Sequence, residues 1–365
     1  MSKARRFPDF WILSATLLIL MIGVIMVYSA SAVLAFHDFG DSYYYLKRQL
    51  IFAVLGIAAM LILMNVDYHY WKRYAKLGLI LGFALLILVL IPGIGVVRGG
   101  ARSWLGIASL GIQPSEFMKL AMIIFMAKFL SEPSSDITSF RRGLLPMLLL
   151  MGAAFGLIML QPDLGTGAVL LGATMMIIFS AGARLSHLIS LGAIGLAGFA
   201  GLIIAAPYRL KRILNFIDPW ADPLGGGYQI IQSLYAIGPG GLVGLGLGMS
   251  RQKYNYLPEP QTDFIFSILA EELGFIGGAS LILLFLLLVW RGMRCAITAP
   301  DSFGSLLAVG IVGMIAVQVI INIGVVTGMM PVTGITLPLV SAGGSSLTLM
   351  LTAIGILLNI SRHSK

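Results

Sequence analysis

Charged residues are scarce in this chain of 365 residues, where Lys, Arg, Asp and Glu together make up 11% of the sequence. Soluble domains carry about 25% charged residues, so this sequence could not cover a water-exposed surface. Its four His residues show no metal-site spacing, and its single cysteine, Cys295, excludes an internal disulfide. These deficits exclude a soluble enzyme, a disulfide-stabilised secreted scaffold and a disordered protein.

Long apolar stretches are what the chain has in abundance. Hydrophobic residues make up 58% of it, and the mean hydropathy is +0.96. A helix needs about 20 mostly apolar residues to cross the hydrocarbon core of a membrane. Uncharged stretches that meet this need lie at residues 10–36, 49–66, 77–97, 143–162, 164–183, 185–208, 273–290 and 302–361, the last divided in two by Pro331 and Pro338. A tenth candidate at 114–131 carries three charges.

The basic residues at the two ends of the chain favour counting the tenth candidate. Lys3, Arg5 and Arg6 precede the first apolar stretch, and Arg362 and Lys365 follow the last one. Positively charged ends prefer the cytoplasm, and two cytoplasmic ends require an even number of spans. The sequence therefore predicts an all-α protein of the cell membrane, a single polytopic domain over 1–365 with ten transmembrane helices. The net charge of +9 is then a sign of orientation, and no nucleic-acid partner is expected.

The longest connection is an outer loop of about 209–262, between the seventh and eighth spans. Loops of this length are usually either functional or disordered. Its Tyr, Trp and Phe residues favour order, and one short helix is expected near 228–237. We therefore expect a large extracytoplasmic loop that acts as a lid at the outer membrane surface.

Ionisable residues within membrane spans are costly and mark candidate sites. Glu116 and Lys119 have an i, i+3 spacing, so they lie on one helix face and can neutralise each other. This pair is either purely structural or, with Arg102 nearby, part of an anion-binding cluster. We predict that all three residues bind substrate.

Two further groups are weaker candidates for substrate binding. Asp163 follows Pro162 at a helix start, so it is either a helix cap or a carboxylate placed at a positive helix end. Ser345 and Ser346 follow two glycines, a step that either allows close helix packing or exposes backbone amides to a ligand.

Three carboxylates lie within ten residues at the start of the eighth span. With 100° per residue, Glu271 lies about 80° around the helix from Asp263 and about 12 Å deeper, while Glu272 points the opposite way. Asp263, Ser267 and Glu271 are therefore expected to share a polar strip. Capping alone does not account for three acids here, so Asp263 is the candidate catalytic residue and Glu271 a candidate substrate-binding residue. No metal ligand set is assigned, although carboxylates leave a divalent cation possible.

Four segments resemble signatures of one protein family. They are QPSEFMKL (113–120), QPDLGTG (161–167), PEPQTDFIFSILAEELG (258–274) and PVTGITLPLVSAGGSS (331–346). The chain resembles the SEDS family of shape, elongation, division and sporulation proteins, and within it the sporulation members. The motifs come in the family's order and extend over the whole chain. The resemblance implies a peptidoglycan glycosyltransferase that polymerises lipid II outside the membrane with a class B penicillin-binding transpeptidase.

The resemblance also implies roles for particular residues. Asp263 would be the essential carboxylate, and Glu116, Lys119 and Asp163 would line the cavity. A carboxylate at the outer interface can accept a proton from a sugar hydroxyl, and basic groups such as Arg102 and Lys119 can stabilise a departing pyrophosphate. Two alternatives remain at this point. One is a flippase that moves lipid II across the bilayer, and the other is a scaffold that recruits a transpeptidase without chemistry of its own.

Overall fold

The computed structural model describes residues 7–98, 101–106, 111–133, 137–204, 207–254 and 256–364. Within them lie twelve α-helices and one two-stranded hairpin. The elements are α1 Phe10–Phe39, α2 Tyr44–Asn65, α3 His69–Leu90, β1 Gly95–Arg98, β2 Ala101–Leu105, α4 Pro114–Leu130, α5 Leu145–Met159, α6 Leu164–Ser180, α7 Leu185–Ile204, α8 Pro207–Ile217, α9 Tyr228–Ile237, α10 Ile265–Ile297, α11 Ser302–Val326 and α12 Gly344–His363.

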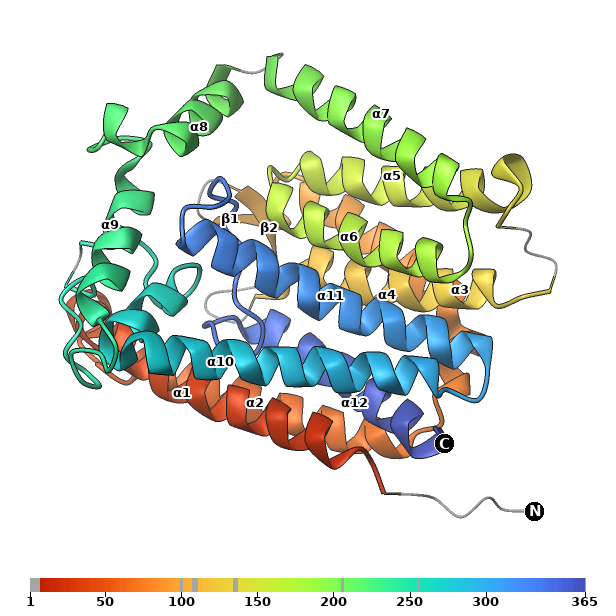
Figure 1. The fold of residues 1–365 in the computed structure, drawn as a ribbon, viewed down its shortest axis with the longest axis horizontal. Coiled ribbons are helices and arrows are strands. Elements are labelled where there is room, and N and C mark those ends of the chain that lie inside the picture. The colour runs from red at the N-terminus through yellow and green to blue at the C-terminus, as the bar shows by residue number, and fades with distance from the viewer. Residues whose placement is uncertain are drawn as a thin grey trace.

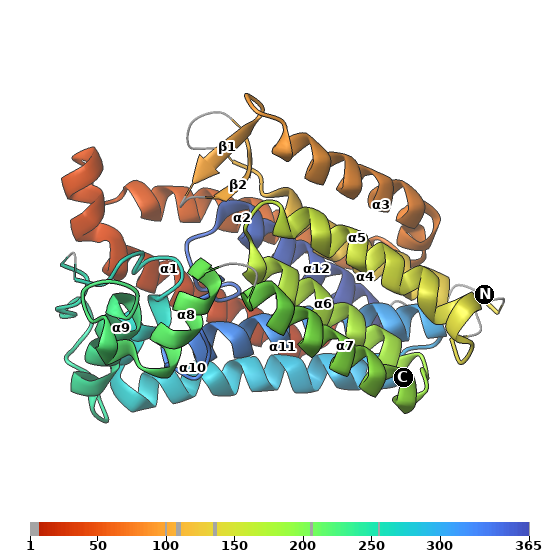
Figure 2. The ribbon, with the colours of Figure 1, turned by 90° about the horizontal axis from the view of Figure 1, so that it is seen from above.

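The long helices run side by side as one bundle (Figure 1). α11 and α12 lie in its middle, and 72% of the apolar window of each is buried against other helices. Seen from above, α2 and α3 lie on one side of this pair and α10 on the other (Figure 2). We call the end of the bundle that carries α8, α9 and the segment up to residue 264 the loop end. The opposite end, where α1 begins and α12 ends, is the termini end.

The multi-pass membrane architecture expected from the sequence is confirmed. Among the described residues, six helices are long and apolar enough to cross a membrane, namely α1, α2, α3, α10, α11 and α12. α4, α5, α6 and α7 occupy the places of the four other expected spans. The count of ten spans stays a prediction, as does the side on which the termini lie. Residues 1–6 and 365, which include Lys3, Arg5, Arg6 and Lys365, are outside the described residues, whereas Arg362 lies in the last turn of α12.

The structure corrects two local expectations. The all-α assignment missed the hairpin β1–β2, whose strands pair in antiparallel fashion. The long loop contains α8 in addition to α9, which begins and ends where the sequence predicts a helix. α10 begins at Ile265, directly after the expected loop, and includes Glu271 and Glu272, whose side chains are buried inside the protein.

Local sequence explains where the helices begin and end. The side chain of Asp9 accepts hydrogen bonds from the backbone amides of Trp11 and Ile12, which caps the first turn of α1. Asp301 caps α11 in the same way by accepting from the amide of Gly304. Between α11 and α12, Pro331 and Pro338 prevent a continuous helix, and the chain runs extended across the loop end.

Candidate functional site

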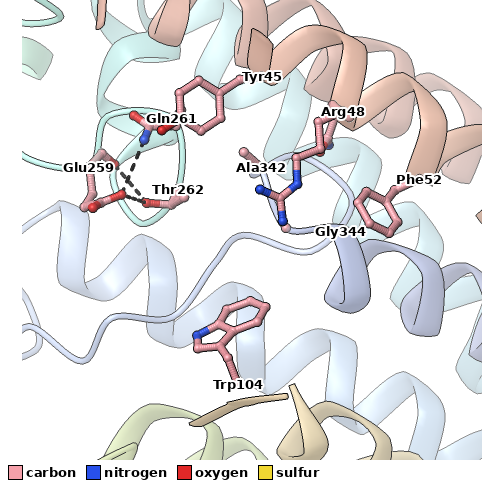
Figure 3. A pocket seen from close by; sticks show the side chains of 11 residues that line it. Tyr45, Arg48, Phe52, Trp104, Glu259, Gln261, Thr262, Ala342 and Gly344 are labelled. Atoms are coloured by element: carbon pink, nitrogen blue, oxygen red, sulfur yellow. Dashed lines mark hydrogen bonds between the residues drawn. The ribbon is translucent and has the colours of Figure 1, made fainter. Parts of the chain in front are cut away.

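A pocket of about 280 Å³ opens at the loop end of the bundle (Figure 3). Its walls come from α2, from the hairpin strand β2, from the turn 259–262 and from residues 342–344, which lead into α12. Distant parts of the sequence therefore meet here, and two of the four walls, 259–262 and 342–344, belong to the sequence motifs. Trp104 supplies an aromatic wall, and Arg48 and Glu259 supply charges of opposite sign.

Arg48 is the cation of this pocket. Its guanidinium reaches toward the centre of the pocket in Figure 3 and lies 5.9 Å from the centre of the Phe52 ring. A guanidinium presents up to five N–H donors in a plane, which suits the oxygens of a phosphate. Arg102, the cation expected here from the sequence, lies half-buried in β2, two residues from Trp104, and does not line the pocket.

Glu259 lies in a strained turn at the edge of the pocket. Its backbone has a φ of 50°, a conformation that residues other than glycine rarely adopt. Its carboxylate accepts a hydrogen bond from the hydroxyl of Thr262 at 3.0 Å, and its backbone carbonyl accepts from the amide of the same residue. Strain of this kind is often found at functional sites.

Asp263 directly follows this turn and is half-buried. Among the described residues, none donates a hydrogen bond to its carboxylate. Burial, together with the negative charges of Glu259 and Asp163, raises the pKa of Asp263 from its ordinary value to about 7. Its carboxyl group therefore changes charge near neutral pH, as a general base in water-poor surroundings needs to do.

The backbone around Asp263 is held by a buried amide of α11. Asn322 donates to the carbonyl of Asp263 at 2.8 Å and to that of Ile335 at 2.6 Å. The extended segment 331–338 is thereby fastened beside the carboxylate. Its Gly334 has a φ of 74°, and a Cβ placed there would lie 3.6 Å from the Asp263 carboxylate. These contacts fix the carboxylate relative to the centre of the bundle.

The Glu116–Lys119 pair forms as the sequence predicts. Lys119 Nζ lies 2.8 Å from Glu116 Oε1, and both side chains are buried. The same ammonium donates to Gln318 on α11 at 3.1 Å, and Gln318 donates in turn to the carbonyl of Thr336. This chain of contacts connects the ion pair to the segment that passes Asp263.

Asp163 and Ser345 are brought together by a residue that the sequence analysis did not single out. Gln113 donates from its side-chain amide to Asp163 at 2.9 Å, and its backbone N–H donates to the Ser345 hydroxyl at 3.3 Å. The other carboxylate oxygen of Asp163 caps α6 by accepting from the amide of Thr166. Ser346 is half-buried near the turn at Gly343.

The polar strip expected from Asp263 to Glu271 does not form. Ser267 lies within hydrogen-bond distance of the Ser233 hydroxyl of α9, at 2.8 Å. The Glu271 carboxylate accepts from the hydroxyl of Ser250 at 2.5 Å and from the amide of Arg251 at 2.8 Å. Ser267 and Glu271 do lie on one side of α10, as their spacing predicts. The loop before α10 folds back over this side of the helix and binds both residues.

Glu272 is buried about 100° around α10 from Glu271, and Ser250 donates to both carboxylates. Its partners are the hydroxyl of Ser29 on α1, at 2.7 and 2.8 Å, and Lys253, whose Nζ lies 3.0 Å away. Lys253 also donates to the carbonyl of Gly248. We call Glu271, Glu272, Lys253 and their partners Ser29, Ser250 and Arg251 the loop lock, because they fasten the loop 248–253 to α1 and α10.

Several functional candidates were missed from the sequence, and only some of them carried a signal. Gln318 and Asn322 are spaced i, i+4 in an otherwise apolar helix, so they could have been recognised as one buried polar face. Arg48 gave no signal, because it resembles any basic residue near the end of a span. Among the described residues, no cluster of three His, Cys, Asp or Glu side chains could hold a metal ion.

Comparison with known proteins identifies relatives over the full length of the chain. The profile of the FTSW_RODA_SPOVE family, described as cell cycle protein, matches residues 10–365. Stage V sporulation protein E of Bacillus subtilis is 62% identical over 365 residues, which cover 100% of both chains. A probable peptidoglycan glycosyltransferase FtsW of a Geobacter species is 43% identical, covering 98% of this chain and 97% of its own.

Solved structures share the fold. A chain from a structure described as "Structural coordination of polymerization and crosslinking by a peptidoglycan synthase complex" superposes with a TM-score of 0.81 at 33% identity, covering 97% of this chain and 98% of its own. The rod shape determining protein RodA of Thermus thermophilus gives a TM-score of 0.71 at 30% identity, covering 97% of both chains.

Proposed function

Because the chain belongs to the FtsW/RodA/SpoVE family, we propose that it is a peptidoglycan glycosyltransferase that polymerises lipid II, with Asp263 as its general base. Relatives named peptidoglycan glycosyltransferases and a chain from a peptidoglycan synthase complex support this activity. The observation that carries the assignment of Asp263 is its half-buried carboxylate beside the pocket, with a pKa of about 7.

The reaction joins two lipid-linked disaccharides. A hydroxyl oxygen of the acceptor sugar attacks the anomeric carbon of the donor, and the bond from that carbon to the undecaprenyl pyrophosphate breaks. Asp263 takes the hydroxyl proton as the new glycosidic bond forms. The leaving pyrophosphate carries away the electron pair, so a cation placed beside it lowers the barrier.

Arg48 is the cation best placed to meet the pyrophosphate. It lines the pocket, whereas Lys119 is buried and already paired with Glu116 and Gln318. We assign Lys119, Glu116 and Asp163 the role of holding the cavity walls through Gln318 and Gln113. This assignment keeps these residues at the substrate cavity but gives the contact with phosphate to Arg48.

The decisive experiment compares lipid II polymerisation by purified wild type and Asp263→Asn. Asn has nearly the same size but accepts no proton at neutral pH, so we expect a loss of at least about a hundredfold. Glu271→Gln is the matched control, since it also replaces a carboxylate by an amide on the same segment, and its carboxylate is bound by Ser250 and Arg251. Thermal unfolding and co-purification of the transpeptidase report folding.

The outcomes separate the candidate functions. Near-normal polymer from Asp263→Asn would contradict the catalytic assignment. A wild type that moves lipid II across vesicles but forms no polymer in detergent would indicate the flippase. A wild type that does neither, yet binds its transpeptidase, would indicate the scaffold.

The partner and the orientation are part of the same proposal. We propose a crosslinking transpeptidase, a class B penicillin-binding protein, as the partner, because a similar chain belongs to a complex that coordinates polymerization and crosslinking. Sporulation or division is the proposed process, since the relatives include stage V sporulation protein E and the family is described as cell cycle protein. The loop end then faces the outside and both termini face the cytoplasm. Arg251→Cys, at an exposed position of the loop, should react with a membrane-impermeant maleimide in intact cells. Reaction only after lysis would reverse the orientation.

A further inference from the structure

Two contacts between α1 and α10 lie about one membrane thickness apart. At the termini end, Arg291 of α10 binds the carboxylate of Asp9, and toward the loop end Glu272 binds Ser29. Twenty residues separate Asp9 from Ser29, and nineteen separate Glu272 from Arg291. At 1.5 Å per residue both distances are about 30 Å, the thickness of the hydrocarbon core. We take the level of Glu272 as the membrane boundary at the loop end, because it lies one hydrocarbon thickness from the Asp9–Arg291 contact.

The backbone of α10 is broken close to this boundary. Gly274 has a φ of 66° and a ψ of −164°, so the helical hydrogen bonds stop there. The loop 240–246 takes their place. Leu245 and Gly246 donate to the carbonyls of Glu271 and Glu272, and the amides of Phe275 and Ile276 donate to the carbonyls of Gly241 and Leu242.

This pairing sets the depth of the loop. Gly244 lies so close to the helix that a Cβ there would come within 2.1 Å of the Glu272 carbonyl oxygen. Leu242 and Val243 consequently lie at the level of Phe275 and Ile276, about one helical turn inside the boundary set by Glu272. Figure 1 shows the loops at this end gathered around the tip of α10.

The outer surface of the loop is apolar. Leu242, Val243, Leu247 and Met249 are 71%, 75%, 56% and 66% exposed. Residues 223–250 contain no Asp, Glu, Lys, Arg or His. An apolar surface of this kind would promote aggregation if it faced water. Such surfaces normally mark a contact with a protein or a membrane.

The exposed residues continue the lipid-facing side of α10. Along that helix Trp290, Leu286, Leu283 and Ile276 are 60%, 57%, 63% and 57% exposed. Leu242 and Val243 follow where this row reaches the break at Gly274. The lipid that surrounds the exposed side of α10 therefore also covers Leu242 and Val243.

We propose that residues 242–249 form an interfacial membrane anchor, which inserts Leu242, Val243, Leu247 and Met249 into the leaflet at the loop end. Through the hydrogen bonds to residues 271–276, the anchor holds the broken part of α10 at the membrane surface. The inference does not depend on the reaction proposed above.

Spin labels can measure the depth of the loop. Cys295 is the only cysteine, so Cys295→Ser gives a background for single labels. Labels at Leu247→Cys, at Phe275→Cys and at Arg251→Cys are compared in nanodiscs of phosphatidylethanolamine and phosphatidylglycerol that hold one protein each. Phe275 is 68% exposed on α10 and serves as the lipid reference, while the exposed Arg251 serves as the water reference. Thermal unfolding confirms that each labelled protein is folded.

The measured quantity is the ratio of collision rates with oxygen, which dissolves in lipid, to those with a water-soluble nickel chelate. We expect the ratio at residue 247 to exceed that at residue 251 several-fold and to approach that at residue 275. A ratio at 247 equal to that at 251 would place the loop in water and overturn the proposal. Protection from both reagents would show a protein contact, such as a partner helix, and would overturn it as well.

Discussion

The two ends of the ten-residue segment 263–272 carry carboxylates with opposite surroundings. At one end, Glu271 and Glu272 are buried, and each accepts several hydrogen bonds within the loop lock. At the other end, Asp263 is half-buried beside the pocket, and no described residue donates a hydrogen bond to its carboxylate. Removing a buried carboxylate that is fully hydrogen-bonded destabilises the structure, because its partners are left unpaired. A carboxylate without hydrogen-bond donors is free to accept a proton.

This contrast separates two roles that the sequence places on one helix. The loop lock decides where the loop before α10 lies, and therefore where the turn 259–262 and Asp263 are held. Asp263 is left to change its protonation state. The sequence predicts that Glu271 binds substrate, whereas in the structure its carboxylate accepts hydrogen bonds from Ser250 and Arg251 of the loop.

The largest expected effect is on the loop lock. Glu272→Ala leaves Lys253 buried without its carboxylate partner, so we expect the free energy of unfolding to fall by about 3–5 kcal/mol. Denaturation of the purified protein in a detergent of fixed composition measures this loss. Glu259→Ala is the matched control, because Glu259 is an exposed carboxylate on the same connection. An equal loss from both variants would remove the distinction between the two ends.

The Glu116–Lys119 pair offers the next test. Either single exchange, Glu116→Lys or Lys119→Glu, buries two like charges, while the double exchange restores a pair. We expect a coupling energy of about 0.5–3 kcal/mol between the two positions, measured by a double-mutant cycle of thermal stability. Activity should recover only in part, because the exchanged side chain no longer donates to Gln318. Full activity would make the pair purely structural.

The pH dependence tests the other end of the segment. Because the base must be ionised, we expect the polymerisation rate to fall up to about tenfold per pH unit below pH 7. Stability should change the opposite way. The pKa of Asp263 is raised in the folded state, so the fold favours the protonated form and loses stability as the pH rises from about 4 to 7. Asp263→Asn should abolish this slope, and an unchanged slope would contradict the raised pKa.

The smallest effect is expected at Glu271. Glu271→Gln keeps one oxygen that can accept from Ser250 or Arg251, so we expect a loss of stability of about 1 kcal/mol. Polymerisation per folded molecule should stay close to that of wild type, as measured with the Asp263→Asn series. A loss of activity as large as that of Asp263→Asn would return Glu271 to the substrate site.

The sequence by itself determined the features that depend on short separations along the chain. Apolar length predicts the membrane helices, and the prolines near residues 331 and 338 predict the break before α12. The i, i+3 spacing places Glu116 beside Lys119, and the helical period separates Glu271 from Glu272. These outcomes follow from backbone geometry, which every segment carries with it.

The tertiary structure alone decided which partner faces each polar group. Arg48 reaches the pocket because α2 packs against α12, and Glu271 is covered because the loop 240–253 pairs with a broken helix. Asn322 meets the carbonyl of Asp263 across 59 residues of sequence. A helical period gives the direction of a side chain, but packing between distant helices decides what lies in that direction.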